Sequence, residues 1–152
     1  MALELLPLVP GQSVHLTNWF PFVRSGGATL STLTNTESIY LRIDAPQSAS
    51  AGWRSRAVIP EGDYIFSCNV IAKESPIPLP GHIPVVLLRL GGDLGGAALT
   101  TVGQWQSLSY RFIVPSGGRS AEFLCELQAG RGDIWIDLHS ISVAKYTSIP
   151  AN

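Results

Sequence analysis

The stretch WQSLSYRFIVP at residues 105–115 decides the fold. Its large apolar residues fall on one parity and its small or charged residues on the other: Leu108, Tyr110, Phe112 and Val114 against Ser107, Ser109 and Arg111. A β-strand places alternate side chains on opposite faces, so this pattern predicts a strand with one buried face. The rest of the chain is expected to cover that face.

Other segments repeat this alternation and are separated by turn residues such as Gly, Pro and Asn. The expected strands are a short one at 13–17 and longer ones at 39–43, 53–59, 64–72, 85–90, 105–114, 121–127 and 134–143. No segment has helical periodicity. The sequence therefore predicts an all-β fold, a two-sheet antiparallel jelly-roll β-sandwich of about eight strands with an apolar N-terminal arm.

The usual jelly-roll strand order also predicts which strands share a sheet. The strands expected together are 39–43, 64–72, 85–90 and 121–127. Cys68 and Cys125 would then lie on neighbouring strands, and both are in phase with buried residues. Two interpretations stay open, buried free thiols or a cross-strand disulfide.

The end of the chain contains two further local signals. Residues 130–133 are expected to turn the chain into its last strand. Within that strand the apolar residues switch parity, and a one-residue bulge near His139 or Ser140 would explain the switch.

Composition indicates a single domain that associates with other proteins. Charged residues are 14% of the 152 residues and the net charge is −1, whereas soluble domains average about 25% charged residues. Low surface charge favours association, so we expect a homo-oligomer or a subunit of a larger assembly such as a capsid. The ten Lys and Arg residues form no basic run, which argues against nucleic-acid binding.

The two ends of the chain are expected to flank the folded domain. Residues 1–12 are an apolar arm, residues 13–146 the jelly-roll domain and residues 147–152 a tail. The arm has an acidic residue, two prolines and no basic flank, so it is unlike a signal peptide, and no apolar run is long enough to span a membrane. The arm's candidate interface residues are Leu3, Leu5, Leu6 and Leu8.

Several motifs resemble those of a known family. GGATLS, SIYLRI, PEGDYIFSCNV, GQWQSLSYRFIVP and GDIWIDLHSISV are similar to carbohydrate-binding modules of the family 4 and 9 type, in the galactose-binding-like jelly-roll superfamily. The similarity spans residues 19–143. It implies a jelly roll that binds polysaccharide. Phage tail and virion surface proteins also carry domains of this kind.

In such modules aromatic faces hold the sugar, and polar side chains pair with its hydroxyl groups. The candidate ligands on the predicted outward face are Tyr40, Arg42, Asn69, Arg89, Glu122, Glu126 and Gln128. The alternative is an ordinary solvated face, because only one of them is aromatic. Trp19 is expected to be either an exposed platform or a hydrophobic plug, whereas Trp53, Trp105 and Trp135 are expected to be packing residues.

The same predicted face has more apolar residues than a solvated face needs. These candidate interface residues are Ile65, Ile71, Val85, Leu87 and Leu124. Either a partner covers them, or the apolar arm or the Pro-rich loop does.

Asp137 matches the family position that often helps to hold a structural calcium ion, a cation that prefers oxygen ligands. Leu138 and His139 follow it where the family pattern has other residues, and no third ligand is evident. The sequence indicates no cofactor other than this calcium.

The sequence contains no nucleophile elbow, zinc-binding helix, phosphate loop or Cys-x-x-Cys motif, so we expect that it is not an enzyme. Two functions remain open. The first is a structural or docking protein on a larger particle, a capsid-decoration or tail protein of a phage virion, made in the host cytoplasm. The second is a glycan-binding module, free or appended to a glycoside hydrolase in an extracellular protein. On composition we rank the first ahead of the second.

Overall fold

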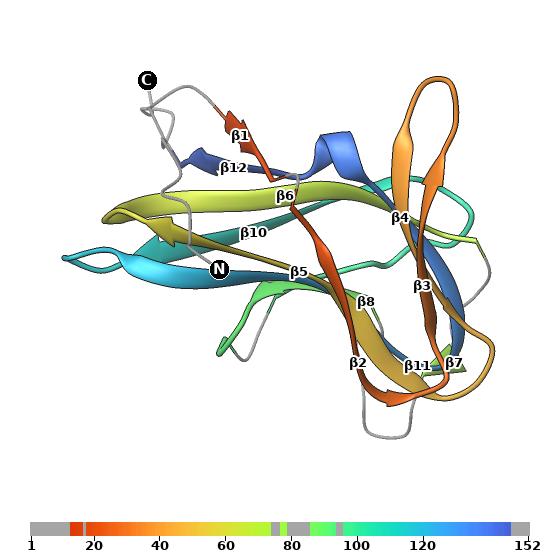
Figure 1. Cartoon of the computed structure of the whole chain (residues 1–152). Helices are drawn as coiled ribbons and strands as arrows, with labels where there is room; N and C mark the ends of the chain where they lie inside the picture. The colour runs from red at the N-terminus through yellow and green to blue at the C-terminus, as the bar shows by residue number, and fades with distance from the viewer. Residues whose placement is uncertain (1–12, 17, 74–76, 79–85, 94–95, 147–152) are drawn as a thin grey trace.

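The computed structural model describes residues 13–16, 18–73, 77–78, 86–93 and 96–146 (Figure 1). These residues form two antiparallel β-sheets, which confirms the predicted all-β jelly-roll sandwich. The expected arm, the expected tail and Val85 lie outside the described residues, and with the arm so do Leu3, Leu5, Leu6 and Leu8. No helix among the described residues is long and apolar enough to cross a membrane.

Sheet A is the layer that contains the longest hydrogen-bonded pairing of the fold. In order across the sheet, its strands are β2 (Phe20–Gly26), β5 (Ala49–Ile59), the first part of β11 (Arg119–Asp137), β8 (Val86–Leu90) and β9 (Ala97–Ala98). The short strand β7 (Ile77–Pro78) pairs with β11 where β11 leaves this sheet.

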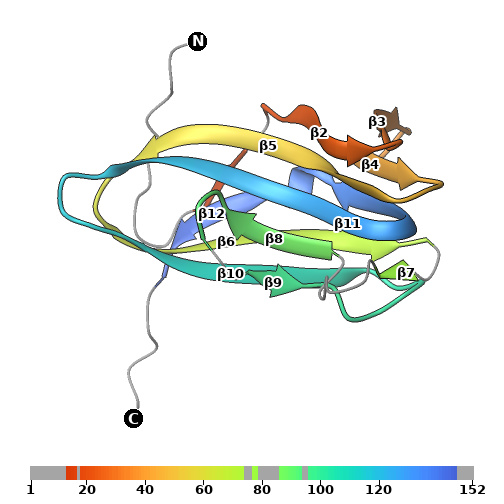
Figure 2. The same cartoon turned by 90° about the horizontal axis from the view of Figure 1, so that it is seen from below.

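Sheet B is the facing layer. In order, its strands are β3 (Thr29–Thr34), β4 (Ile39–Ala45), the second part of β11, β6 (Gly62–Ala72) and β10 (Gln106–Val114). Strand β12 (Ser142–Lys145) also pairs with β6, and β1 (Ser13–His15) pairs with β12. Figure 2 shows β5 and β11 in one layer, with β6 and β10 in the other.

Strand β11 belongs to both sheets. Residues 119–129 pair with β5 in sheet A, and residues 132–137 pair with β4 in sheet B. The predicted turn at 130–133 is therefore wrong, because Arg131 pairs with Ile77 and Gly132 with Ala45, so the chain stays extended.

This shared strand also corrects the predicted sheet membership. Residues 39–43 and 64–72 lie in sheet B, whereas residues 86–90 and 121–127 lie in sheet A. The four strands expected in one sheet are thus divided between two. Candidate ligands placed on one face by sequence therefore lie on opposite sides of the molecule.

Near the end of the chain, the buried apolar residues switch from even to odd positions because a turn interrupts the strand. The predicted one-residue bulge is therefore wrong. A 3-10 turn, Leu138–Ser140, separates β11 from β12. The Asp137 carboxylate accepts a hydrogen bond from the His139 N–H, which caps this turn. After the turn, Ile141 and Val143 are both fully buried.

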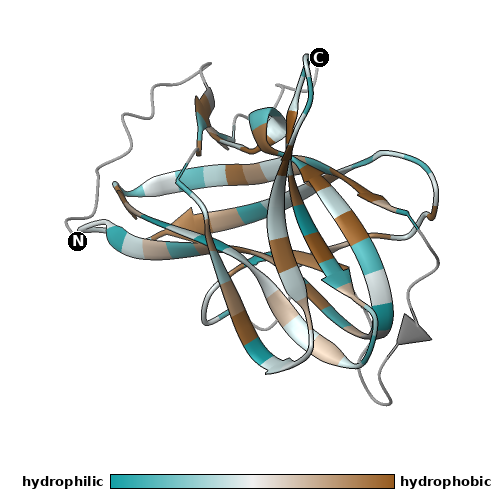
Figure 3. Cartoon of the chain, turned by 45° about the vertical axis from the view of Figure 1, so that its right-hand side comes forward, coloured by the Kyte–Doolittle hydropathy of each residue, from teal (hydrophilic) through white to brown (hydrophobic). Residues whose placement is uncertain are grey.

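The core lies between the two sheets and is built from the inward rows of the strands. In β10, Leu108, Phe112 and Val114 are buried as the sequence predicts, and Tyr110 is half-buried against them. Figure 3 shows the alternating hydrophobic and hydrophilic bands along the strands. Phe123 from sheet A meets the ring of Phe66 from sheet B edge-on, with 4.9 Å between ring centroids.

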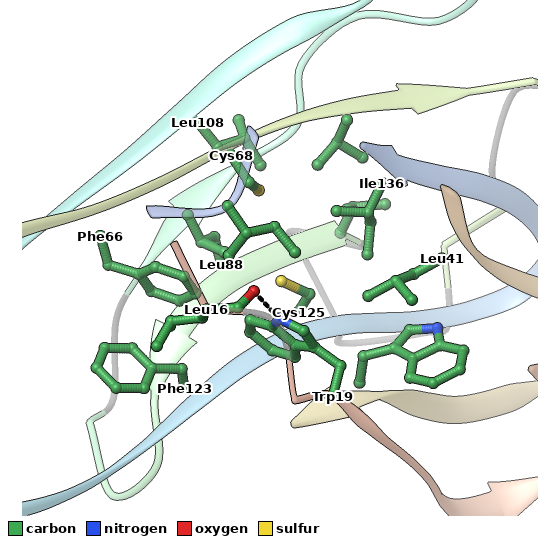
Figure 4. Close-up of a cluster of buried hydrophobic side chains, with 14 of the residues drawn as sticks. Leu16, Trp19, Leu41, Phe66, Cys68, Leu88, Leu108, Phe123, Cys125 and Ile136 are labelled. Carbon is green, nitrogen blue, oxygen red and sulfur yellow. Dashed lines mark hydrogen bonds between the residues drawn. The ribbon is translucent and has the colours of Figure 1, made fainter. Parts of the chain in front are cut away.

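Cys68 and Cys125 face each other across this core from opposite sheets (Figure 4). Both are free and buried, which confirms the buried thiols and overturns the cross-strand disulfide. Sheets that pack face to face lie about 10 Å apart, whereas disulfide-bonded cysteines need Cα atoms within about 7 Å. Burial, together with a hydrogen bond to Cys68, raises the pKa of the Cys125 thiol.

The two thiols should therefore resist modification in the folded protein. The thiolate is the reactive species. Both thiols are buried away from the reagent, and the raised pKa of Cys125 further disfavours its thiolate. We expect a thiol-reactive chromogenic disulfide at pH 8 to label the native chain at least about 100-fold more slowly than the chain in 6 M guanidinium chloride. Rapid labelling of two thiols per native chain would contradict the packed core described here.

Candidate functional site

Three aromatic side chains gather on the outer face of sheet B. Tyr40 projects from β4, Trp135 from β11, and Trp105 immediately precedes β10. The ring of Tyr40 stacks on Trp105 with 5.7 Å between centroids, and it lies 5.6 Å from the ring of Trp135 at a tilt of 47°. We call these three residues the aromatic site.

The contact between Tyr40 and Trp105 shows that sheet B is curled. Strands β4 and β10 are separated by β11 and β6, and three strand spacings in a flat sheet would amount to about 14 Å. The two rings nevertheless stack, so the outer face is concave where they meet. Figure 1 shows β3 and β4 turned steeply relative to β6 and β10.

The aromatic site is open to solvent on one side and packed on the other. Trp105 is 46% exposed, whereas Tyr40 and Trp135 are half-buried. Trp135 forms the floor, and the Lys73 ammonium lies 4.2 Å from the centre of its ring. The indole Nε1 of Trp135 is buried and has no hydrogen-bond partner among the described residues.

Polar side chains border the aromatic rings. Arg42 lies opposite Trp135 and binds Asp133 through two hydrogen bonds of 2.9 Å each. Asp44 lies 3.5 Å from the same guanidinium group. The hydrogen bonds to Asp133 raise the pKa of Arg42, so this residue is a permanent cation held in place.

On the other side of the rings, Asp137 pairs with Tyr40 in the β11–β4 register, and Asn69 on β6 is exposed. No side-chain hydrogen bond of Asn69 is recorded among the residues that the structure describes. A carboxamide can both donate and accept hydrogen bonds.

Gln106 holds the loop that presents Trp105. Its Oε1 atom accepts hydrogen bonds from the backbone N–H groups of Thr100 and Thr101, at 2.9 and 3.2 Å. The N–H of Gly103 donates to the carbonyl of Ala72, which ties the same loop to the end of β6. Trp105 is thus a positioned platform on a tethered loop.

The arrangement suits a ligand that has both apolar patches and hydroxyl groups. Exposed aromatic faces can stack on the C–H surface of a sugar ring, and neighbouring amide, carboxylate and hydroxyl groups can pair with its hydroxyl groups. The described residues contain no group of three or more His, Cys, Asp or Glu side chains that could hold a metal ion. Asp137, the calcium ligand that the family resemblance implies, uses its carboxylate to cap the 3-10 turn.

Three of the residues predicted from sequence lie on the outer face of sheet B: Tyr40, which belongs to the aromatic site, and Arg42 and Asn69, which lie on neighbouring outward positions. The other candidates, Arg89, Glu122, Glu126 and Gln128, lie on the outer face of sheet A. Glu126 is only 1% exposed, because Arg89 binds both of its carboxylate oxygens and Arg24 also contacts it. Glu122 pairs with Arg56 at 3.0 Å. Glu126 therefore has no surface left to bind a sugar.

Two of the four tryptophans lie in the core as expected. Trp19 is 9% exposed, and its Nε1 donates to the Leu16 carbonyl, so it is a core plug and not a platform. Trp53 is a packing residue as predicted. The packing role predicted for Trp105 is wrong, because its side chain is 46% exposed. Trp135 does pack, but on the outer face of sheet B against Tyr40 and Lys73. Both tryptophans share parity with polar outward neighbours, and that signal could have placed them on the outer face.

The predicted apolar interface does not form one surface. Ile65 and Ile71 lie in sheet B, whereas Leu87 and Leu124 lie in sheet A. Ile71 is buried beside Trp135, and Leu124 is 1% exposed between Arg54 and Arg89 on neighbouring strands. The prediction of a continuous exposed patch is wrong for two reasons. The described residues lie on the outer faces of two different sheets, and side chains on neighbouring strands cover Ile71 and Leu124.

Comparison with known proteins identifies the fold. No protein-family model matches the chain, and no curated protein matches its sequence. Among solved structures, TmCBM61, in complex with beta-1,4-galactotriose, superposes with a TM-score of 0.61 at 13% identity, over 87% of this chain and 91% of that one. A CBM4 structure superposes with a TM-score of 0.60 at 14% identity, over 91% and 94% of the two chains.

A third similar structure is the enzymatically active domain of tailspike protein 4 from bacteriophage CBA120. It superposes with a TM-score of 0.58 at 18% identity over 86% of this chain, which spans only 20% of the length of that one. The chain thus has the jelly-roll fold of carbohydrate-binding modules, a fold that also occurs within a phage tailspike.

Replacing Gln106 should release the Trp105 platform. In Gln106→Leu the hydrogen bonds to Thr100 and Thr101 are lost, so we expect a loss of about 0.5–1.5 kcal/mol in the free energy of unfolding. We also expect greater quenching of tryptophan fluorescence by acrylamide, because Trp105 is the exposed indole. Ser109→Ala, an exposed change on the same strand, is the control. Unchanged quenching in Gln106→Leu would show that Gln106 does not position Trp105.

Proposed function

We propose that this chain is a non-catalytic glycan-binding module whose binding surface is the aromatic site on sheet B. The observation that carries the proposal is the convergence of Tyr40, Trp105 and Trp135 on a concave, solvent-facing surface bordered by polar groups. Monomeric domains normally bury tryptophan or pair it with a partner. An exposed indole held by a tethered loop is therefore well suited to stack on a sugar ring.

The fold supports the same proposal independently of the site. The likeness to TmCBM61 and CBM4 extends over most of both chains, so the whole domain has the architecture of a binding module. Fold alone does not assign function. The aromatic site supplies the local chemistry that the fold does not.

We thus rank the glycan-binding function ahead of the docking role, which reverses the ranking made from composition. The apolar residues that favoured assembly are divided between two sheets, and Ile71 and Leu124 among them are buried. Of the aromatic site, only Tyr40 was predicted from sequence. A docking role on a phage particle remains a second candidate, supported by the likeness to the tailspike domain. The two roles are compatible, because a module in a virion or an extracellular protein can bind polysaccharide while another surface attaches it.

Affinity electrophoresis tests the glycan proposal. The purified chain is run through gels containing β-1,4-galactan, xylan, mannan or mixed-linkage β-glucan, and at least one should retard it. In Trp105→Ala and Tyr40→Ala the stacking surface is lost, so affinity should fall at least about tenfold, equivalent to about 1.4 kcal/mol.

Phe20→Ala is the matched control, because Phe20 is a similarly exposed aromatic residue in sheet A. Circular dichroism and thermal unfolding of all variants establish that they are folded. Retention by no polysaccharide, or retention that Trp105→Ala leaves unchanged, would refute the aromatic site. Light scattering that shows stable oligomers without any glycan retention would instead favour the docking role.

A further inference from the structure

We propose that the outer face of sheet A carries a second binding site, which takes the anionic groups of an acidic polysaccharide. The site consists of Phe22 and Arg24 on β2 and Arg54 on β5, and we call these three residues the arginine site. It lies in the other sheet from the aromatic site. The inference therefore goes beyond the proposed function and does not depend on it.

The arginine site places two guanidinium groups against one aromatic ring. The central carbon atoms of the Arg24 and Arg54 guanidinium groups lie 4.9 and 5.9 Å from the centre of the Phe22 ring. Phe22 pairs with Gly52, which has no side chain, and Arg54 lies two residues further along β5. An aromatic face attracts an exposed cation by about 0.5–1 kcal/mol. Phe22 therefore holds two like charges close together, so that one acidic chain can contact both.

The nearest carboxylate does not neutralise these two cations. Arg24 contacts Glu126, but both carboxylate oxygens of Glu126 already accept hydrogen bonds from Arg89, at 2.9 and 3.1 Å. One carboxylate thus serves two guanidinium groups. In the part of the chain that the structure describes, no carboxylate pairs with Arg54.

A count of the charges over the whole outer face of sheet A agrees with this local arrangement. The charged side chains described on this face are four arginines and two glutamates: Arg24, Arg54, Arg56, Arg89, Glu122 and Glu126. At the edge beyond β8, Arg119 and Asp93 add one charge of each sign. Because Arg56 pairs with Glu122, and Glu126 serves both Arg89 and Arg24, the excess of two positive charges falls on the arginine site.

Both guanidinium groups are accessible to a ligand. The side chain of Arg24 is 42% exposed, and Arg54 is exposed beside the buried Leu124 of the neighbouring strand. A guanidinium group presents its N–H donors in a fork that matches the oxygen atoms of an anionic group. Charge-assisted hydrogen bonds of this kind are about twice as strong as neutral ones. The site therefore suits the carboxylate or sulfate groups of an acidic sugar.

The shape of the charged surface favours an extended polymer over a folded protein. The arginine site lies on β2, which is the edge strand of sheet A among the described strands, and on the adjacent β5. A strand of seven residues is roughly 23 Å long. On the far side of β5 the face is occupied by arginine–glutamate pairs, whereas a stable protein interface buries about 800 Å² on each partner. A narrow strip of positive charge fits a linear acidic chain.

Affinity electrophoresis at 20 mM NaCl tests this site. Gels contain polygalacturonate or alginate, which carry carboxylates, or dextran sulfate, and gels with neutral dextran serve as the reference. We expect at least one acidic polymer to retard the chain. Arg24→Gln/Arg54→Gln should weaken that binding at least about tenfold, because both donors of the site are lost. Raising NaCl to 200 mM should also weaken it, because salt screens exposed charges.

Two comparisons separate the arginine site from general attraction between opposite charges. Arg111→Gln/Lys145→Gln removes the same number of positive charges from sheet B, and it should retain most of the affinity. Phe22→Leu should weaken binding several-fold, because the ring that holds the guanidinium groups is lost, whereas Phe22→Tyr keeps a ring and should bind as the unaltered chain does. Circular dichroism and thermal unfolding establish that all variants are folded.

Several results would overturn the second site. They are retardation by no acidic polymer, retardation that Arg24→Gln/Arg54→Gln leaves unchanged, and equal losses in the two double variants. Binding of acidic polymer that Trp105→Ala abolishes would assign it to the aromatic site instead. Oligomers that light scattering detects and that Arg54→Gln dissolves would show that the site binds a second copy of the chain. The neutral polysaccharides test the aromatic site separately, so either proposal can fail while the other stands.

Discussion

The hydrogen bonding of β11 to both sheets is the constraint on which the rest of the structure depends. One continuous strand of 19 residues cannot pair with β5 at its beginning and with β4 at its end unless the two layers approach each other along its length. Gly132, at the crossing, is buried and pairs with Ala45 of β4. The position of the two layers, and the core between them, follows from this path.

The same path shapes the aromatic site. Because β11 leaves sheet A and enters sheet B between β4 and β6, strands β3 and β4 are carried around with it, and sheet B curls toward its outer face. Curling brings Tyr40 within stacking distance of Trp105 across two intervening strands. In a flat sheet Tyr40 and Trp135 could still touch, because they are diagonal neighbours on paired strands. Trp105 would lie apart from them, so the complete site is a consequence of topology as much as of sequence.

Sequence alone predicts the local features of this protein well, because they depend on period-2 alternation within one strand. The burial of Leu108, Phe112 and Val114 is of this kind. Sheet membership depends on contacts between distant segments. The prediction of it fails at residues 130–133, where Gly and Asp are typical of a turn but the chain stays extended and paired. The candidate site was predicted in part for the same reason: the outward direction of Tyr40 is local, whereas its contact with two tryptophans requires knowledge of which strands are neighbours.

The low content of charged residues takes on a different meaning once the charges are placed. Many of them form ion pairs between neighbouring strands. Sheet B holds Arg42 with Asp133 and Arg111 with Asp63, and sheet A holds Arg56 with Glu122 and Arg89 with Glu126. The more exposed of these pairs add little stability, and Glu126 is buried in its pair with Arg89. All of them leave fewer free charges to compete for a ligand. A surface that binds polyhydroxylated, uncharged polymers needs aromatic faces and fixed hydrogen-bonding groups more than it needs net charge. The composition that suggests association therefore equally fits the proposed glycan-binding module.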